Sequence, residues 1–144
     1  KVPLAASYFY YPMYHSLLNR EDESEIPADF NIFDRMLPKN DIDVYQRVYR
    51  YKIYEVSYWN NLLGEKLAGL MSEPEQFVNS YIDELNKLGL HEQIRDDIGN
   101  NFVMQYYNEL PEEAVLILKS RYKEIVVNPK YLKEIERVFQ NVLP

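Results

Sequence analysis

One stretch, from Asn40 to Gly64, constrains the fold of this chain more than any other part of the sequence. Its apolar side chains recur at spacings of three and four residues, a period that places them on one face of an α-helix. These residues are Tyr45, Val48, Tyr49, Val56, Trp59, Leu62 and Leu63. Asn40 or Asp41 can cap the start of the helix, and Gly64 can end it by adopting the left-handed conformation. The stretch predicts a long central helix over about residues 41–63, within a segment 41–64.

The segment 72–142 predicts four consecutive amphipathic helices. The first opens with a capping box, in which Ser72 and Glu75 satisfy each other's backbone N–H groups. Its apolar residues again recur at helical spacing, and Gly89 ends it.

The other three helices of this segment carry their own boundary signals. One runs from about His91 to Asn108, and Gly99 in its middle could permit a close helix crossing. The next begins after Pro111 with acidic residues and ends with basic ones, an order that suits the helix dipole. The last begins at Asn128 and Pro129.

These helices define the predicted fold class. Only the passage VLILKSRYKEIVV, residues 115–127, could pass for a strand, and its charge order and helical neighbours favour a helix. No self-similar signature with a period of 34 residues is present. We expect an all-α, single-domain antiparallel helical bundle over residues 1–144, with five to seven helices around the long central one.

The N-terminal segment 7–40 has a different character, first aromatic and then acidic. Helical spacing begins after Pro12, and five acidic residues between Glu21 and Asp29 then interrupt it, which indicates a solvated loop. A short helix is expected to end at Met36, before Leu37 and Pro38.

Charge and composition exclude several classes of protein. The net charge of −7 argues against binding to nucleic acid, whose phosphates would be repelled. Residues 65–113 hold eleven acids and three bases, and residues 114–144 hold six bases and three acids. The chain has no cysteine, so it has neither thiol catalysis nor zinc–thiolate sites. No run of about 18 apolar residues could span a membrane. Because the chain begins with Lys1 and stops at Pro144, we expect a piece of a longer protein.

The residue types that usually carry chemistry do not form a recognisable site. His91-Glu92 lacks the second histidine of a zinc peptidase motif, since position 95 is Arg95. His15 lies among aromatic residues and is expected to be a hydrogen-bonded, partly buried side chain. Asp96 and Asp97 point about 100° apart on a helix and do not form a proton-sharing pair by themselves.

The acidic loop that begins at Glu21 could offer oxygen ligands to calcium, but it lacks the alternating pattern and the glycine of such sites. We therefore assign no catalytic, cofactor-binding or metal-binding residue and no cofactor. The chain as given is not expected to be an enzyme.

Tyrosine is the one unusual feature of the composition, with 14 residues among 144. These rings either fill the core, with their hydroxyl groups at its edge, or form a recognition surface for a protein or a sugar. Tyr54 is the first surface candidate, because it lies on the polar side of the predicted central helix. Tyr8, Tyr10 and Tyr11 follow, because they precede the first helix and cannot all point inward.

The last third of the chain carries Tyr131, Ile135 and Phe139 at intervals of four in a helix that begins at Asn128. This pattern resembles the helical region before the thioredoxin fold in bacterial extracytoplasmic thiol–disulfide proteins of the TlpA-like/redoxin group. The resemblance covers about 60 residues, and the Cys-x-x-Cys of that group is absent here. It implies a non-catalytic domain of an exported, periplasmic or lipid-anchored protein, whose full length would be a thiol–disulfide oxidoreductase.

The expected function is therefore a helical accessory module that acts through protein contacts. Under the resemblance it would position or dimerise a downstream thioredoxin-like domain, so that its partner is its own downstream domain or another protomer. The alternatives are a tyrosine-rich domain that binds a glycan or a peptide, and a stand-alone protein–protein interaction domain.

Overall fold

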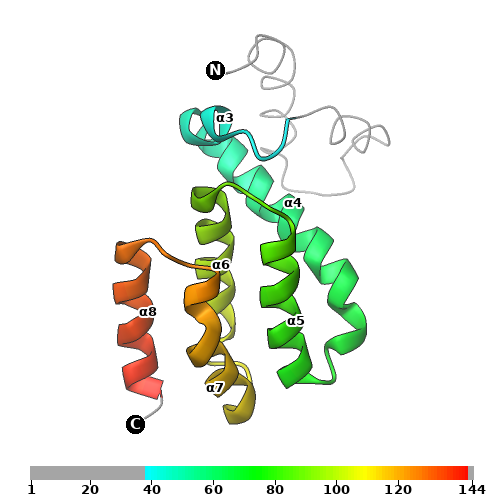
Figure 1. Ribbon diagram of the computed structural model, residues 1–144, viewed down its shortest axis with the longest axis vertical. Helices are drawn as coiled ribbons and strands as arrows, with labels where there is room; N and C mark the ends of the chain where they lie inside the picture. The colour runs from blue at the N-terminus through cyan, green and yellow to red at the C-terminus, as the bar shows by residue number, and fades with distance from the viewer. Residues whose placement is uncertain (1–37, 143–144) are drawn as a thin grey trace. The chain divides into compact units, whose positions relative to one another are not determined.

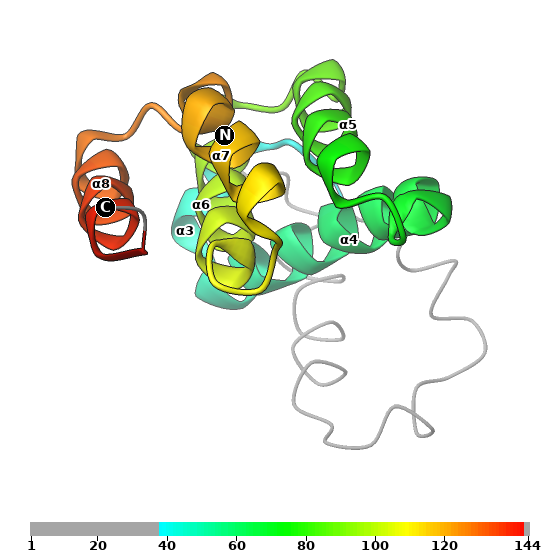
Figure 2. The same cartoon turned by 90° about the horizontal axis from the view of Figure 1, so that it is seen from below.

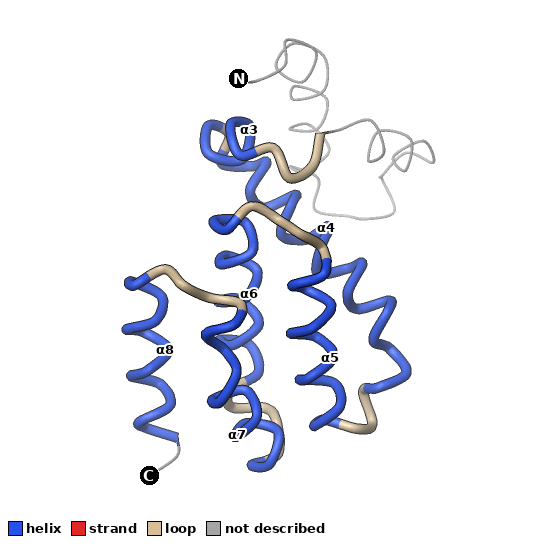
Figure 3. The backbone as a smooth tube through the Cα atoms, in the orientation of Figure 1, coloured by secondary structure: helices blue, strands red, loops and turns tan. Residues whose placement is uncertain are grey.

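The computed structural model of the 144-residue chain describes residues 38–142. Over this range the chain is helical and contains no strand, so the predicted all-α class is confirmed (Figure 1, Figure 3). The α-helices are α3 (Ile42–Arg47), α4 (Tyr49–Leu67), α5 (Pro74–Lys87), α6 (Glu92–Tyr106), α7 (Glu112–Arg121) and α8 (Pro129–Val142). Two short 3-10 turns, η3 (Ala68–Leu70) and η4 (Tyr122–Glu124), follow α4 and α7. The predictions for the segment 7–37 lie outside the described residues.

The predicted central helix is not continuous. Val48 adopts an extended conformation, with φ −121° and ψ 102°, and separates α3 from α4. On an unbroken helix Tyr45 and Tyr51 would lie about 120° apart around the axis. The break lets both rings be buried, with 0% and 2% of their surface exposed. Asp41 caps α3 as predicted, because its Oδ1 accepts hydrogen bonds from the backbone N–H groups two and three residues later.

Two other predicted boundaries are wrong. Gly64 does not end α4, which continues to Leu67, and among the described glycines only Gly89 has a positive φ. Ser72 does not cap α5, because Glu73 takes the N-cap position without a side-chain hydrogen bond. A residue before proline avoids the α region, so Glu73 stays non-helical and the helix begins at Pro74.

The contacts within the chain divide it into two compact units, residues 1–55 and residues 56–144, and the boundary falls within α4. The predicted single domain therefore stays a prediction. In the described part of the first unit, the backbone N–H of Asn40 donates to Oε1 of Glu55 at 2.8 Å. Glu55 is fully buried, and this bond holds the chain before α3 against the start of α4.

The second unit contains two helical pairs that repeat, α5 with α6 (the first pair) and α7 with α8 (the second pair). α5 packs against α7, and α6 packs against α8, so that each helix of one pair contacts its counterpart in the other (Figure 2). An offset of 37 residues relates the two pairs, from Pro74 to Pro111. The same offset relates the N-caps of α6 and α8, His91 and Asn128, and both accept a hydrogen bond from the backbone N–H two residues later. The structural repeat is thus longer than the 34-residue signature that is absent from the sequence.

The core residues of the two pairs correspond at the same offset. Six positions are buried in both pairs: Phe77 and Ala114, Val78 and Val115, Tyr81 and Leu118, Leu85 and Tyr122, Ile98 and Ile135, and Phe102 and Phe139. Only three of the six pairs keep the same residue, which explains why the repeat is faint in the sequence. These are Val78 and Val115, Ile98 and Ile135, and Phe102 and Phe139.

Gly99 makes the close approach that its position in the sequence suggested. A Cβ at this position would lie 2.7 Å from the carbonyl oxygen of Ile125 and 3.0 Å from Cγ2 of Val126. The neighbour is therefore the segment after η4 rather than another helix. The missing side chain lets the second helical pair sit directly on α6.

Candidate binding pocket

A pocket of about 290 Å³ opens between α4, α5 and α6 in the second unit. We call it the aromatic pocket. Its lining consists of Asn60, Gly64, Met71, Phe77, Tyr81, Phe102, Gln105 and Tyr106. None of these side chains carries a charge at neutral pH, and half of them are aromatic. The pocket is therefore suited to an uncharged, apolar group.

Closely packed rings form the wall of the aromatic pocket. Tyr81 and Phe102 stack face to face, with ring centroids 3.7 Å apart and an angle of 7° between the planes. Phe77 meets Tyr106 nearly edge-on at 5.5 Å. These two contacts join α5 to α6, whose aromatic residues recur at spacings of four (Phe77 and Tyr81, Phe102 and Tyr106). Such packing fixes the ring positions before any ligand binds.

Polar groups in the aromatic pocket are few and already partly used. The hydroxyl of Tyr81 donates a hydrogen bond to Oδ1 of Asn60 at 2.9 Å, which joins α5 to α4. Burial raises the pKa of Tyr81 well above its usual range, and Tyr106 adds to this effect, so the hydroxyl stays neutral. The Asn60 amide group and the exposed Gln105 remain as polar side chains of the lining.

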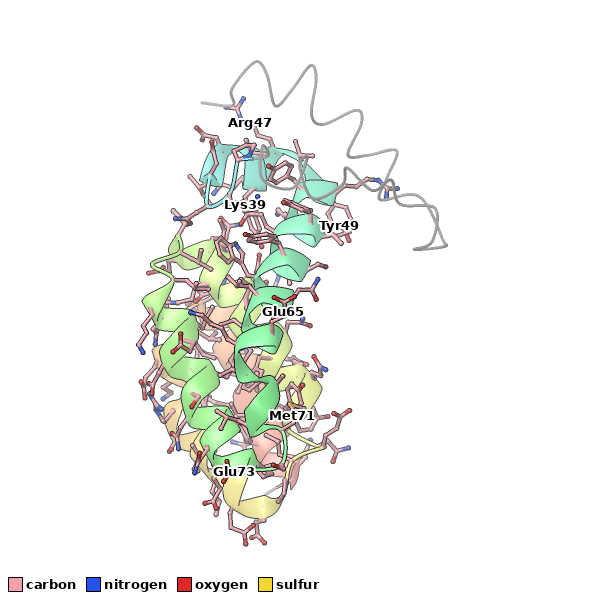
Figure 4. All side chains as sticks on the ribbon, turned by 90° about the vertical axis from the view of Figure 1, so that its right-hand side faces the viewer. Lys39, Arg47, Tyr49, Glu65, Met71 and Glu73 are labelled. Atoms are coloured by element: carbon pink, nitrogen blue, oxygen red, sulfur yellow. The ribbon has the colours of Figure 1, made fainter. Side chains whose placement is uncertain are left out.

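Met71 and Gly64 are exposed members of the lining of the aromatic pocket. Met71 follows η3 and is 58% exposed, an unusual position for a large apolar side chain. Figure 4 shows it on the side of the helical body that also carries Glu65. No atom lies within 4 Å of the position that a Gly64 Cβ would take, so a side chain there would enter open space beside the pocket.

The candidate surface residues from the sequence do not lie at this site. Tyr54 was expected at the surface, but only 4% of its area is exposed, so that prediction is wrong. Its ring packs against Tyr51 at 5.5 Å, and the ammonium group of Lys39 lies 5.6 Å from the ring centre. The break at Val48 changes the direction in which this side of α4 faces, which periodicity on one continuous helix could not reveal. Tyr8, Tyr10 and Tyr11 lie outside the described residues.

The polar residues considered for chemistry have structural partners. His91 caps α6 by accepting a hydrogen bond from the backbone N–H of Gln93. Asp96 is buried and accepts hydrogen bonds from the backbone N–H groups of Val127 and Asn128, at 3.1 and 3.0 Å. It therefore anchors the start of α8, a role that the sequence did not reveal.

Asp97 accepts a hydrogen bond from the hydroxyl of Tyr131 on α8. Burial and this bond to a carboxylate raise the pKa of Tyr131 to about 12. The two neighbouring aspartates thus bind different groups, as their helical positions predicted.

Within residues 38–142, no cluster of three or more histidine and acidic side chains could hold a metal ion. Over the same range, no helix has both the length and the apolar character needed to cross a bilayer.

The sequence identified the pocket-lining rings as apolar helix residues but gave no sign that a pocket separates them from α4. That pocket depends on where Gly64 and Met71 lie in space.

Comparison of the chain with protein-family models, with curated proteins and with solved structures finds no match.

Proposed function

We propose that this chain is a non-catalytic helical module that acts through protein contacts, and that the aromatic pocket receives an apolar side chain of its partner. One observation carries the proposal, namely a preformed, uncharged aromatic pocket beside an exposed methionine. Interfaces concentrate their binding energy where an anchor side chain fills such a pocket. Methionine is frequent at binding surfaces because its flexible thioether adapts to different partners.

The size of the aromatic pocket supports a side chain as its occupant. Its volume of about 290 Å³ lies at the lower end of the range for small-molecule sites, which is roughly 300–1,000 Å³. The lining offers no charged group that could orient an ionic substrate. A single aromatic or aliphatic side chain meets both conditions.

The resemblance of the last helix to the TlpA-like/redoxin group supports a more specific version of the proposal. In this version the module belongs to an exported thiol–disulfide protein, and it positions or dimerises a downstream thioredoxin-like domain. The partner at the aromatic pocket is then that domain or another protomer. Tyr131, Ile135 and Phe139 carry the resemblance.

A small glycan or peptide is the second candidate ligand. It is favoured by the amide side chains of Asn60 and Gln105, which lie beside the aromatic rings. Sugars bind where rings stack on their apolar face and amides bond to their hydroxyl groups. A glycan would therefore use the same pocket.

Site-specific photo-crosslinking in the full-length protein tests the proposal. A benzophenone amino acid replaces Met71 beside the pocket, and in a matched control it replaces Leu116, which is 50% exposed on α7. We expect the probe at Met71 to form a discrete protein adduct, within the same protein or with another chain, that the control does not form. Mass spectrometry then identifies the partner.

A second change links that adduct to the aromatic pocket. Gly64→Met adds a large side chain at the lining of the pocket, and Gly69→Met is its control, because Gly69 also has open space around it but does not line the pocket. We expect Gly64→Met alone to remove the adduct while the helical circular dichroism signal is unchanged. An adduct that survives Gly64→Met, or the absence of any protein adduct at Met71, would contradict the proposal.

A further inference from the structure

The second pair covers one face of the first pair. At the positions of that face, the residues of the two pairs differ in character. Ile82, Gly99 and Val103 are buried in the first pair. At the offset of 37 residues, Lys119, Glu136 and Gln140 occupy the same positions in the second pair, and all three are exposed. The six shared core positions remain buried, so the change from apolar to polar is confined to one face.

These three polar residues lie around one groove. The groove has a volume of about 370 Å³ between α7 and α8, and its lining also includes Ser120, Tyr122, Lys123 and Phe139. Tyr122 and Phe139 form an apolar floor, since both rings are buried and their centroids lie 5.6 Å apart. We call this site the α7–α8 groove.

The equivalent place on the first pair is filled by protein. There the carbonyl oxygen of Ile125 and a methyl group of Val126 lie over Gly99. On the first pair, the surface around Gly99 therefore binds a segment of chain that carries apolar side chains. In the second pair, no atom of the described residues takes the corresponding place, and the α7–α8 groove stays open.

Positive charge surrounds the α7–α8 groove. Lys119 and Lys123 line it directly, and an adjoining hollow on α8, which shares Glu136 and Gln140 with it, adds three more basic side chains. These are Lys130, Lys133 and Arg137. The two hollows contain two acidic residues, and one of them, Glu134, pairs with Arg137 at 2.5 Å. The basic excess is therefore a local property of this face in a chain of net charge −7.

We propose that the α7–α8 groove binds an acidic protein segment, in which a large apolar side chain contacts Tyr122 and Phe139 and flanking carboxylates pair with Lys119 and Lys123. A third helical pair of the same kind does not fit, because it would bury Lys119, Glu136 and Gln140 without partners. Glu136 carries a side chain where the first pair has Gly99, so we expect the bound segment to lie further from α8 than Ile125 lies from α6. The site is separate from the aromatic pocket.

Fluorescence anisotropy with a labelled peptide tests this assignment. The probe is Glu-Glu-Ile-Val-Glu-Glu, which combines the Ile-Val pair that covers Gly99 with flanking carboxylates, and the control peptide has lysine in place of each glutamate. We expect the acidic peptide to bind and the basic peptide not to bind. Lys119→Glu with Lys123→Glu should weaken binding by about tenfold or more, and added salt should weaken it too. Gly64→Met, in the aromatic pocket, should leave it unchanged.

A variant with the first pair's residues separates this proposal from self-association. Lys119→Ile, Glu136→Gly and Gln140→Val together restore the apolar face of the first pair. Light scattering should give the same mass for the wild-type chain and the double lysine variant, which indicates no self-association through this groove. It should give a larger mass for the triple variant, because that variant exposes an apolar face. Binding of both peptides alike, or wild-type self-association that the double lysine variant abolishes, would overturn the proposal. Because Gly64→Met separates the two sites, failure here would not affect the proposed function of the aromatic pocket.

Discussion

Replacing Gly99 with alanine sets two physical effects against each other, and the structure decides between them. Alanine in the middle of a helix is more favourable than glycine by about 1 kcal/mol. A Cβ at position 99, however, would lie 2.7 Å from a backbone carbonyl oxygen and 3.0 Å from a valine methyl group. A Cβ atom essentially never lies within 3.0 Å of a non-bonded heavy atom in a folded protein, so the chain after η4 must move.

The cost of this movement exceeds the gain in helix propensity. Overpacking a well-filled core costs about 1–3 kcal/mol and more where backbone must shift. Here the backbone N–H of Ile125 donates a hydrogen bond to the carbonyl oxygen of Tyr122. The backbone N–H groups of Val127 and Asn128 donate to the carboxylate of Asp96, so the segment is held on both sides of Val126. With so little freedom to adjust, we expect Gly99→Ala to lower the free energy of unfolding by about 2 kcal/mol.

Gly64→Ala is the matched control for this change. Gly64 also lies within a helix, but nothing stands within 4 Å of its Cβ position. Only the propensity effect remains, so we expect stabilisation by roughly 0.5–1 kcal/mol. Urea denaturation followed by circular dichroism at the helical minimum gives both values, since the midpoint moves while the slope stays constant. Equal stabilisation by the two substitutions would refute the close packing of the second pair on α6.

Three further changes test individual contacts. Arg121→Lys should lower the free energy of unfolding by about 1–2 kcal/mol in the same urea assay, because lysine cannot reproduce the paired bonds to Glu124 or the bridge from α7 to α5. Asp96→Ala should cost about 2–4 kcal/mol, because it leaves two backbone N–H groups of the α8 start without acceptors, and a loss under about 0.5 kcal/mol would contradict that role. The folded pKa of Tyr131, about 12, lies above the ordinary value of 10.0, so its contribution to stability is complete below pH 10 and is lost as the pH rises through 12. Ultraviolet titration should show tyrosine ionisation near pH 12, and Tyr131→Phe should reduce the amplitude of that step.

Periodicity was sufficient to predict the helical class and the four consecutive helices of residues 72–142, because such a pattern depends only on neighbours along one helix. It also located Gly99 as a point of close approach. It failed at Val48 and Tyr54, where tertiary burial of several tyrosines overrides the pattern of a single helix. The cap of α5 was misplaced because Pro74 forbids a helical conformation at Glu73, a steric effect that outweighs the capping box.

The aromatic pocket and the role of Asp96 were harder to predict, since both depend on residues that are far apart in the sequence. The aromatic pocket needs Gly64 and Met71 beside rings from α5 and α6. The buried carboxylate of Asp96 bonds to groups 31 and 32 residues further along the chain. No local spacing rule contains such pairs.

Phe102 and Phe139 occupy the same position in the two helical pairs, and each lines a hollow. Around Phe102 the lining is uncharged and aromatic, whereas around Phe139 it includes Lys119 and Lys123. The two hollows are not equivalent places in the repeat, because these phenylalanines are the only lining residues that correspond at the offset of 37 residues. The place on the first pair that corresponds to the α7–α8 groove is filled by Ile125 and Val126. The shared phenylalanine must be buried for each pair to fold, whereas the residues at the edge of each hollow are free of that requirement. Those edge residues therefore determine which chemistry each hollow accepts.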